Sequence, residues 1–170
     1  RGRLKIENFE LETVRENGID FRFDNKWRPL KQTDLVYDLH NPPKSTDDFY
    51  GYAESDSYVL KRGEAVLAST LEYMTLPDDL MGFCELRSTY ARLGVSIPPT
   101  IIDATWGGQL TIQMTATRFP VTLHKGDRFL HAIFARLTSP VDQPYRGKYQ
   151  NQRGVALPKS DPTYREKPST

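Results

Sequence analysis

One carboxylate and one amide stand out in the stretch TIIDATWGGQLTIQM, which begins at Thr100. Asp103 precedes a Trp and two Gly, and Gln113 follows in an alternating run of polar and apolar residues. Asp103 could take part in catalysis, or it could cap the turn at Gly107–Gly108. Gln113 can hydrogen-bond a ligand, but an amide cannot accept and release a proton near neutral pH. The two positions therefore limit the reactions that the chain can catalyse.

A second group of polar residues lies in LRSTYARLG, residues 86–94. The pattern predicts one short helix with Ser88 as N-cap and Gly94 just past its end. A helix start presents unpaired N–H groups and partial positive charge, which suit a phosphate chain. The side chains available there are Arg87, Ser88, Thr89 and Arg92. The alternative is an ordinary capped turn with two surface arginines.

Composition excludes several classes of protein. The 170 residues carry 23 Lys and Arg against 22 Asp and Glu, so no global field favours nucleic acid or membrane. The three histidines lack the HxE and PCxxC pattern of zinc deaminases, and the usual Gly-rich phosphate loops are absent. A single cysteine, Cys84, forbids an intrachain disulfide, and no secretory or long apolar segment is present. A soluble cytoplasmic protein of one domain is expected.

Short alternating stretches punctuated by Pro and Gly predict a mostly β fold. SYVLKRGEAVLAST reads as two strands around Arg62–Gly63, and FPVTLHKGDRFLHAIFARL as a hairpin turning at residues 125–127. In GQLTIQMT, the apolar residues face one way and Gln113 lies on the polar face. The apolar limb 129–137 predicts a strand buried on both sides, in a barrel or at a subunit interface. Residues 40–57 read as a long polar loop.

Four segments in order, NGIDFRF, LRSTYARLG, IIDATWGG with KGDRFLHAIF, and PYRGKYQNQ, carry a family resemblance. Together they resemble the superfamily of trimeric dUTP pyrophosphatases and dCTP deaminases, from about residue 14 to residue 153. The resemblance implies a distorted jelly-roll-type β-barrel, assembled as a homotrimer with active sites at subunit boundaries. One domain is expected over residues 1–153. Residues 154–170 are charged and contain Pro, so a flexible tail is expected there, although such a tail can also close over a bound ligand.

The resemblance also implies roles for individual residues. Arg87, Ser88 and Thr89 would hold the triphosphate. Asp103 would orient the attacking water, and Trp106 would stack under the deoxyribose. Asp20 matches an acid that lies near magnesium-bound phosphates, although it could merely close the turn after Asn17-Gly18.

Two further features separate the branches of the superfamily. The KYQNQ tail resembles the deaminase branch, in which Lys148, Gln152 and Tyr145 would contact phosphate and base. Deaminases of this skeleton use a Glu for proton transfer at the position that Gln113 occupies. Hydrolysis of dUTP needs only Mg²⁺, cations and one carboxylate, and deaminase-like dUTPases of archaeal type carry a similar tail. The sequence therefore predicts a dUTP diphosphatase that yields dUMP and pyrophosphate, with Mg²⁺ held through the substrate phosphates.

Two alternatives stay open. The first is a dCTP deaminase, or a bifunctional deaminase and diphosphatase, in which another group replaces the Glu. The second is a non-catalytic nucleotide-binding regulator. His131 stands where dUTPases usually have Gln, and Pro98 and Pro99 remove two N–H donors before Asp103, which bears on base selectivity.

Overall fold

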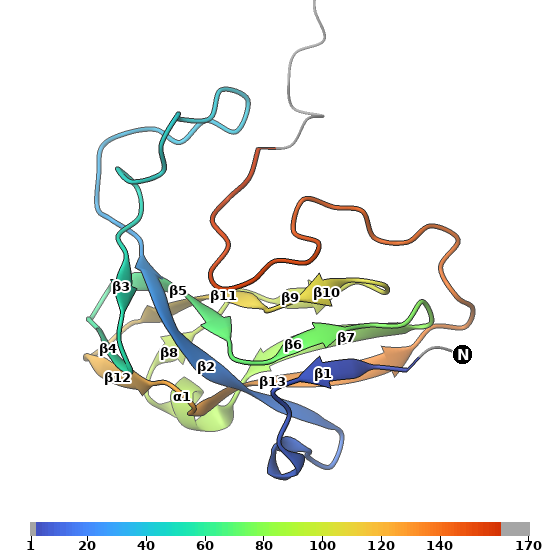
Figure 1. Ribbon diagram of the computed structural model, residues 1–170. Coiled ribbons are helices and arrows are strands. Elements are labelled where there is room, and N and C mark those ends of the chain that lie inside the picture. Colours follow the sequence, from blue (N-terminus) through green and yellow to red (C-terminus); the bar gives the residue numbers. More distant parts are fainter. Residues whose placement is uncertain (1–2, 161–170) are drawn as a thin grey trace, which may run out of the picture.

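The computed structural model describes residues 3–160, and its regular secondary structure is almost entirely β-strand. The all-β class predicted from the alternating stretches is confirmed. A short 3-10 helix covers Leu11–Thr13, and one α-helix, α1, covers Ser88–Arg92 (Figure 1). The strands are β1 (Lys5–Glu7), β2 (Gly18–Pro29), β3 (Ala53–Glu54), β4 (Ser57–Leu60), β5 (Ala65–Thr70), β6 (Tyr73–Thr75), β7 (Leu80–Leu86), β8 (Val95–Ser96), β9 (Thr100–Ile102), β10 (Gly107–Gly108), β11 (Thr111–Ala116), β12 (Val121–His124) and β13 (Arg128–Arg136).

The strands form one large curled sheet and two small ones. The large sheet has the order β8-β11-β5-β2-β13-β7-β9, with β3 added beside β2. The small sheets are β1-β6-β10 and β12-β4, and all strand pairs are antiparallel. Strand order departs from chain order throughout, so neighbours come from distant parts of the sequence. The result is a distorted jelly-roll-type barrel, as the resemblance implied.

An aromatic cluster fills the concave side of the sheet. Phe23 stacks on Phe129 with ring centroids 3.8 Å apart, and Trp27 lies 5.5 Å from Phe23. All three are fully buried. Each such side chain contributes about 1.5–3 kcal/mol through burial, so this cluster joins β2 firmly to β13.

Two predicted hairpins are wrong in their pairing, although their strands exist. β4 pairs with β12, whereas β5 pairs with β2 and β11. Likewise β13 pairs with β2 and β7 rather than with β12. The turns at residues 61–64 and 125–127 therefore carry the chain from one sheet to the other. Closure of the barrel, rather than the local turn, selects the partner of each strand.

The predicted helix is present but begins one residue earlier than expected. Arg87 is the N-cap in extended conformation, and no side chain caps the first turn. Gly94 has φ +76°, the left-handed conformation that a helix end favours for glycine, so its predicted position is confirmed. Arg87 thus lies at the junction between β7 and α1.

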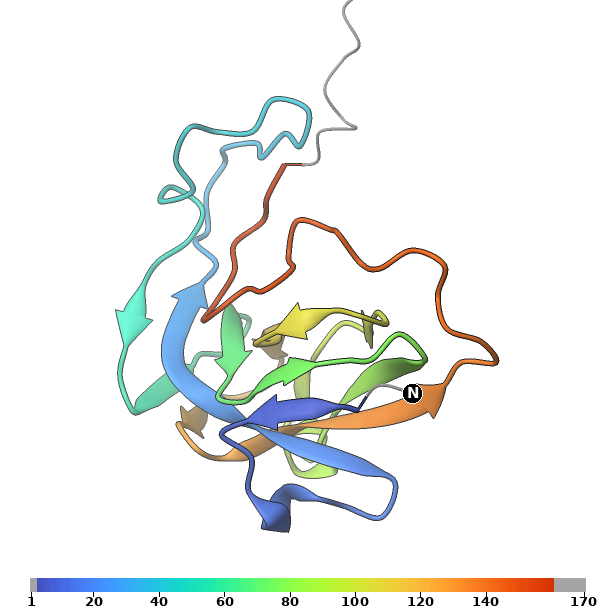
Figure 2. The ribbon, with the colours of Figure 1, turned by 45° about the vertical axis from the view of Figure 1, so that its right-hand side comes forward.

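The long loop 31–52 and the C-terminal segment rise on the same side of the sheet (Figures 1 and 2). The Tyr37 hydroxyl donates to the Pro158 carbonyl across 3.4 Å, which joins the two segments. Residues 154–160 of the predicted tail pack against β11, and residues 161–170 lie outside the described part of the chain. Within residues 3–160, no helix is long and apolar enough to span a membrane.

Candidate functional site

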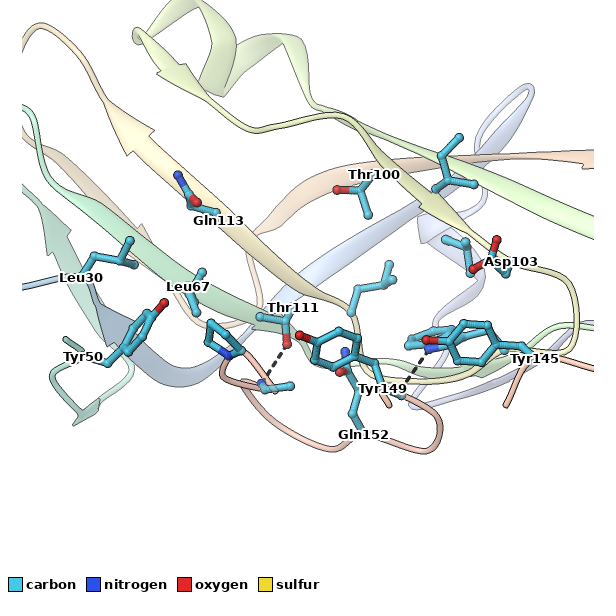
Figure 3. Close-up of a pocket in the computed structure, with 16 residues that line it drawn as sticks. Leu30, Tyr50, Leu67, Thr100, Asp103, Thr111, Gln113, Tyr145, Tyr149 and Gln152 are labelled. Atoms are coloured by element: carbon cyan, nitrogen blue, oxygen red, sulfur yellow. Dashed lines mark hydrogen bonds between the residues drawn. The ribbon is translucent and has the colours of Figure 1, made fainter. Parts of the chain in front are cut away.

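A cavity of about 460 Å³ opens between β11, β9 and the C-terminal segment (Figure 3). Apolar side chains and four aromatic rings form most of its wall. Its lining residues include Leu30, Tyr50, Leu67, Thr100, Asp103, Trp106, Thr111, Gln113, Tyr145, Tyr149 and Gln152. Its size and lining are those of a site for a small organic ligand.

Asp103 and Gln113 both line this cavity, although they come from different strands. Asp103 follows β9 directly and is exposed, and Gln113 lies on the outward face of β11. The alternation predicted for β11 is confirmed, because Ile112 and Met114 are buried while Gln113 is not. Neither the Asp103 carboxylate nor the Gln113 amide has a hydrogen bond or ion pair within residues 3–160. Both polar groups are therefore available to a ligand.

Trp106 forms a fixed floor for the cavity. Its indole is 6% exposed and donates a hydrogen bond to the Tyr149 carbonyl at 3.1 Å. A Cβ at Gly108 would lie 2.7 Å from the indole, so only glycine leaves room for the ring there. Trp106 thus belongs to the core and also lines the cavity. The stacking role that the resemblance implied for this residue stays a prediction.

The C-terminal segment is hydrogen-bonded along the β10–β11 edge. Gln152 donates through Nε2 to the Gln109 carbonyl at 2.7 Å, and the Gly154 N–H donates to Gln109 Oε1 at 2.7 Å. The Ala156 N–H donates to Thr111 Oγ1 at 3.0 Å. Gln152 therefore holds the tail in place while lining the cavity. These contacts with Gln109 and Thr111 fix the position of the segment after Gln152. The sequence patterns did not predict them.

Tyr145 also reaches the cavity, held by the turn that follows Asp103. Its backbone N–H donates to Thr105 Oγ1 at 2.5 Å, and Gln150 donates to the Thr105 carbonyl at 3.0 Å. Thr105 has φ +66°, an uncommon conformation for a β-branched residue. The turn is kept in this conformation by the segment that crosses it.

The arginine turn does not line this cavity. Arg87, Ser88, Thr89 and Arg92 all belong to α1 and its N-cap, and none is among the lining residues. Arg92 donates to Ser88 Oγ at 3.3 Å, and both side chains are exposed. In one copy of the chain, the residues expected to bind phosphate are therefore separated from Asp103.

Lys148, another expected phosphate contact, is also outside the cavity lining. Its ammonium donates to the Lys159 carbonyl at 2.7 Å, and Lys159 donates back to the Lys148 carbonyl at 2.9 Å. Both ammonium groups lie within 6 Å of the centre of the Tyr149 ring, at 5.5 and 5.8 Å. In this conformation Lys148 holds the tail rather than facing the cavity.

Asp20 lies in a charged cluster at the β2–β13 boundary. It is 2% exposed, and its carboxylate is 3.3 Å from Arg87 Nε and 2.9 Å from His131 Nδ1. Arg128 is 4.0 Å away. The position that the resemblance implied for Asp20, near magnesium-bound phosphates, stays a prediction. What the geometry adds is a connection from Asp20 to the arginine turn.

Sequence reasoning missed Tyr50, Tyr149 and Leu67 as cavity residues. Tyr50 comes from the long polar loop predicted over residues 40–57, and burial raises the pKa of its hydroxyl. No local pattern marks it, because its position depends on how the loop folds back toward β5. Tyr149 lies inside the KYQNQ segment and could have been noted there.

A family model described as dCTP deaminase-like matches residues 1–137. The chain therefore belongs to the dCTP deaminase-like family, which confirms the resemblance drawn from its motifs. One relative is a dCTP deaminase of Sulfurisphaera tokodaii, which is 46% identical over 159 residues. The alignment covers 94% of this chain and 85% of the relative. Another is a viral protein of Sulfolobus islandicus rod-shaped virus 1, 43% identical over 159 residues, 94% of this chain and 90% of the relative, named "Probable deoxyuridine 5'-triphosphate nucleotidohydrolase".

The fold has a counterpart among solved structures. The 2'-deoxycytidine 5'-triphosphate deaminase of Agrobacterium tumefaciens matches 79% of this chain with a TM-score of 0.63 and 20% identity. The match spans 43% of the length of the Agrobacterium chain, so the likeness concerns the fold of that part. The relatives are enzymes of nucleotide metabolism. Their names support the deaminase alternative better than the predicted dUTP diphosphatase.

Proposed function

We propose that this protein hydrolyses dUTP to dUMP and pyrophosphate. The observation that supports this proposal is that one cavity is lined by both a carboxylate, Asp103, and an amide, Gln113, which are unpaired within the described residues. Attack of water on a phosphate requires a group that orients the water, and an ionised carboxylate can do so. No proton has to be delivered to the pyrimidine ring, so an amide at residue 113 is sufficient for binding the base.

In this proposal each cavity residue contacts a different part of the substrate or the attacking water. Asp103 orients the attacking water, Trp106 supports the sugar, and Gln113 hydrogen-bonds the base. Mg²⁺ would clamp the phosphate oxygens and offset their charge. The described residues contain no group of three or more His, Cys, Asp or Glu side chains suited to a metal ion. In this proposal Mg²⁺ is held through the substrate phosphates, and Asp20 contacts it through water.

The arginine turn would complete the site from a second copy of the chain. Phe83, Ile101 and Ile133 lie in register across β7, β9 and β13, so they project from the same face of the sheet. Phe83 is 40% and Ile101 53% exposed, so this end of the large sheet presents an apolar row to its surroundings. We infer that this face packs against another copy in a homotrimer. Arg87 and Ser88 of one subunit would then meet the cavity of the next.

dCTP deamination is the second candidate, and the relatives favour it. It requires a group that takes a proton from water and returns protons to N3 and the leaving amine. Asp103 is the one carboxylate among the described residues that line the cavity. A deaminase would therefore have to use Asp103 for this purpose, or a group from another subunit.

Product analysis separates the candidates. The protein is incubated with Mg²⁺ and either dUTP or dCTP, and the nucleotides are resolved by ion-exchange chromatography. The proposal predicts dUMP from dUTP and unchanged dCTP. Formation of dUTP or dUMP from dCTP would support the deaminase candidate. Binding of dUTP without any product would indicate a regulator.

A further inference from the structure

A chain of three side chains joins β13 to the arginine turn. His131 on β13 and Asp20 on β2 are direct partners in the antiparallel register, so they lie side by side on one face. His131 Nδ1 is 2.9 Å from Asp20 Oδ1. An ionised carboxylate only accepts hydrogen bonds, so Nδ1 carries the hydrogen. His131 thereby fixes one oxygen of a carboxylate that is 2% exposed.

The second oxygen of Asp20 faces the guanidinium of Arg87. Oδ2 lies 3.3 Å from Arg87 Nε, is buried, and has no hydrogen bond within the described residues. Arg128 is more distant, at 4.0 Å. Arg87 is the N-cap of α1 and also donates through Nη1 to the Arg128 carbonyl at 3.3 Å. The orientation of its guanidinium therefore depends on where Asp20 Oδ2 is held.

The imidazole itself is held from its outer side. His131 Nε2 lies 3.3 Å from Asn17 Oδ1, and it donates a hydrogen bond to this oxygen when both ring nitrogens carry hydrogen. A Cβ on Gly18 would come within 2.7 Å of the ring, so the absence of a side chain at Gly18 creates the space that the ring occupies. The ring is 19% exposed and fits closely between β2 and the loop before it. Its position is thus defined by the fold rather than by solvent.

We propose that His131 is a positioning residue for the arginine turn: through Asp20 it orients Arg87 for binding a polyphosphate chain. The inference rests on the proposed phosphate role of Arg87. His131 itself does not contact the substrate. Loss of its hydrogen bond frees the Asp20 carboxylate to rotate, and Arg87 loses the fixed partner that aims its remaining donors outward.

The test measures binding of inorganic tripolyphosphate by calorimetry, on the assembled full-length protein. This probe has no base or sugar and needs no turnover, so its result does not depend on which nucleotide is the substrate. His131→Leu removes the donor and is expected to weaken binding about tenfold. His131→Gln retains a donor that can reach Asp20 and should bind within about twofold of the unaltered protein. His124→Leu, at an exposed histidine on β12, is the matched control and should leave binding unchanged.

A double variant distinguishes positioning from a general structural effect. In an Arg87→Ala background, His131→Leu should cause no further loss, because the residue that it positions is gone. An equal loss in both backgrounds would overturn the proposal, and so would unchanged binding by His131→Leu or no tripolyphosphate binding by the unaltered protein. Should His131→Leu fail to fold, Asn17→Ala removes the outer contact of the imidazole and should weaken binding in the same direction. Product analysis with dUTP judges the proposed reaction separately.

Discussion

Two polar side chains of the cavity are unpaired among the described residues, whereas Arg22 and Asp20 on β2 are held in ion pairs. In the cavity, Asp103 and Gln113 have no partner within residues 3–160, although they stand among aromatic side chains. On β2, two charged residues are paired: Arg22 contacts Glu72 at 2.7 Å, and Asp20 contacts two arginines and His131. Unpaired groups are available to a ligand, whereas paired buried charges fix the fold. Substitution of Asp103 or Gln113 should therefore alter activity, whereas loss of the Arg22–Glu72 pair should alter stability.

The largest expected effect is that of Asp103→Asn on the rate of dUTP hydrolysis. The amide keeps the volume but cannot polarise water, so kcat should fall about 10²–10⁴-fold. Because Asp103 is exposed and unpaired, the free energy of unfolding should change by less than about 0.5 kcal/mol. Steady-state kinetics and urea unfolding on the same preparation measure both. Full activity in this variant would contradict the assigned role.

The opposite result is expected for Glu72→Ala. Glu72 is 1% exposed, accepts from the Arg22 backbone N–H at 2.9 Å and pairs with Arg22 Nε. Its removal leaves the Arg22 backbone N–H and Nε without an acceptor, while the guanidinium keeps its contacts to Glu10 and the Asn8 carbonyl. Because one partner of a buried ion pair is lost, the free energy of unfolding should fall by about 3 kcal/mol. Glu85→Ala, at an exposed position on β7, is the control and should change little. Similar stability of both variants would show that the buried pair does not hold this region together.

Mixing of two inactive variants tests whether the cavity of one subunit is completed by the arginine turn of another. In the proposed homotrimer, Asp103→Asn disables the cavity of its own subunit, and Arg87→Ala disables the arginine turn that would serve the neighbouring subunit. In a randomly mixed 1:1 trimer, about a quarter of the sites combine an intact cavity with an intact turn. Refolded mixtures should therefore recover about a quarter of the original activity, while each variant alone stays inactive. No recovery in verified mixed trimers would place both halves of the site in one subunit.

The sequence predicted local features well and pairing poorly. The alternation of β11 defines its buried face, and the left-handed conformation at Gly94 ends α1, because both depend on neighbouring residues alone. The partners of β4 and β12 depend on closure of the barrel, so their turns read as hairpins that do not form. The motifs located Asp103 and Gln113, which the fold brings into one cavity. Tyr50 reaches that cavity only through the course of a long loop, which no residue pattern encodes.

We propose that residue 113 determines which reaction this scaffold performs, and ammonia release from dCTP is the measurement that tests this role. The unaltered protein and Gln113→Glu are incubated with dCTP and Mg²⁺, and ammonia is measured by a coupled assay. The account predicts no ammonia from the unaltered protein and measurable release from Gln113→Glu, because the carboxylate restores a proton-transfer group facing the cavity. Ammonia release by the unaltered protein would contradict the account and identify it as a deaminase that uses another group.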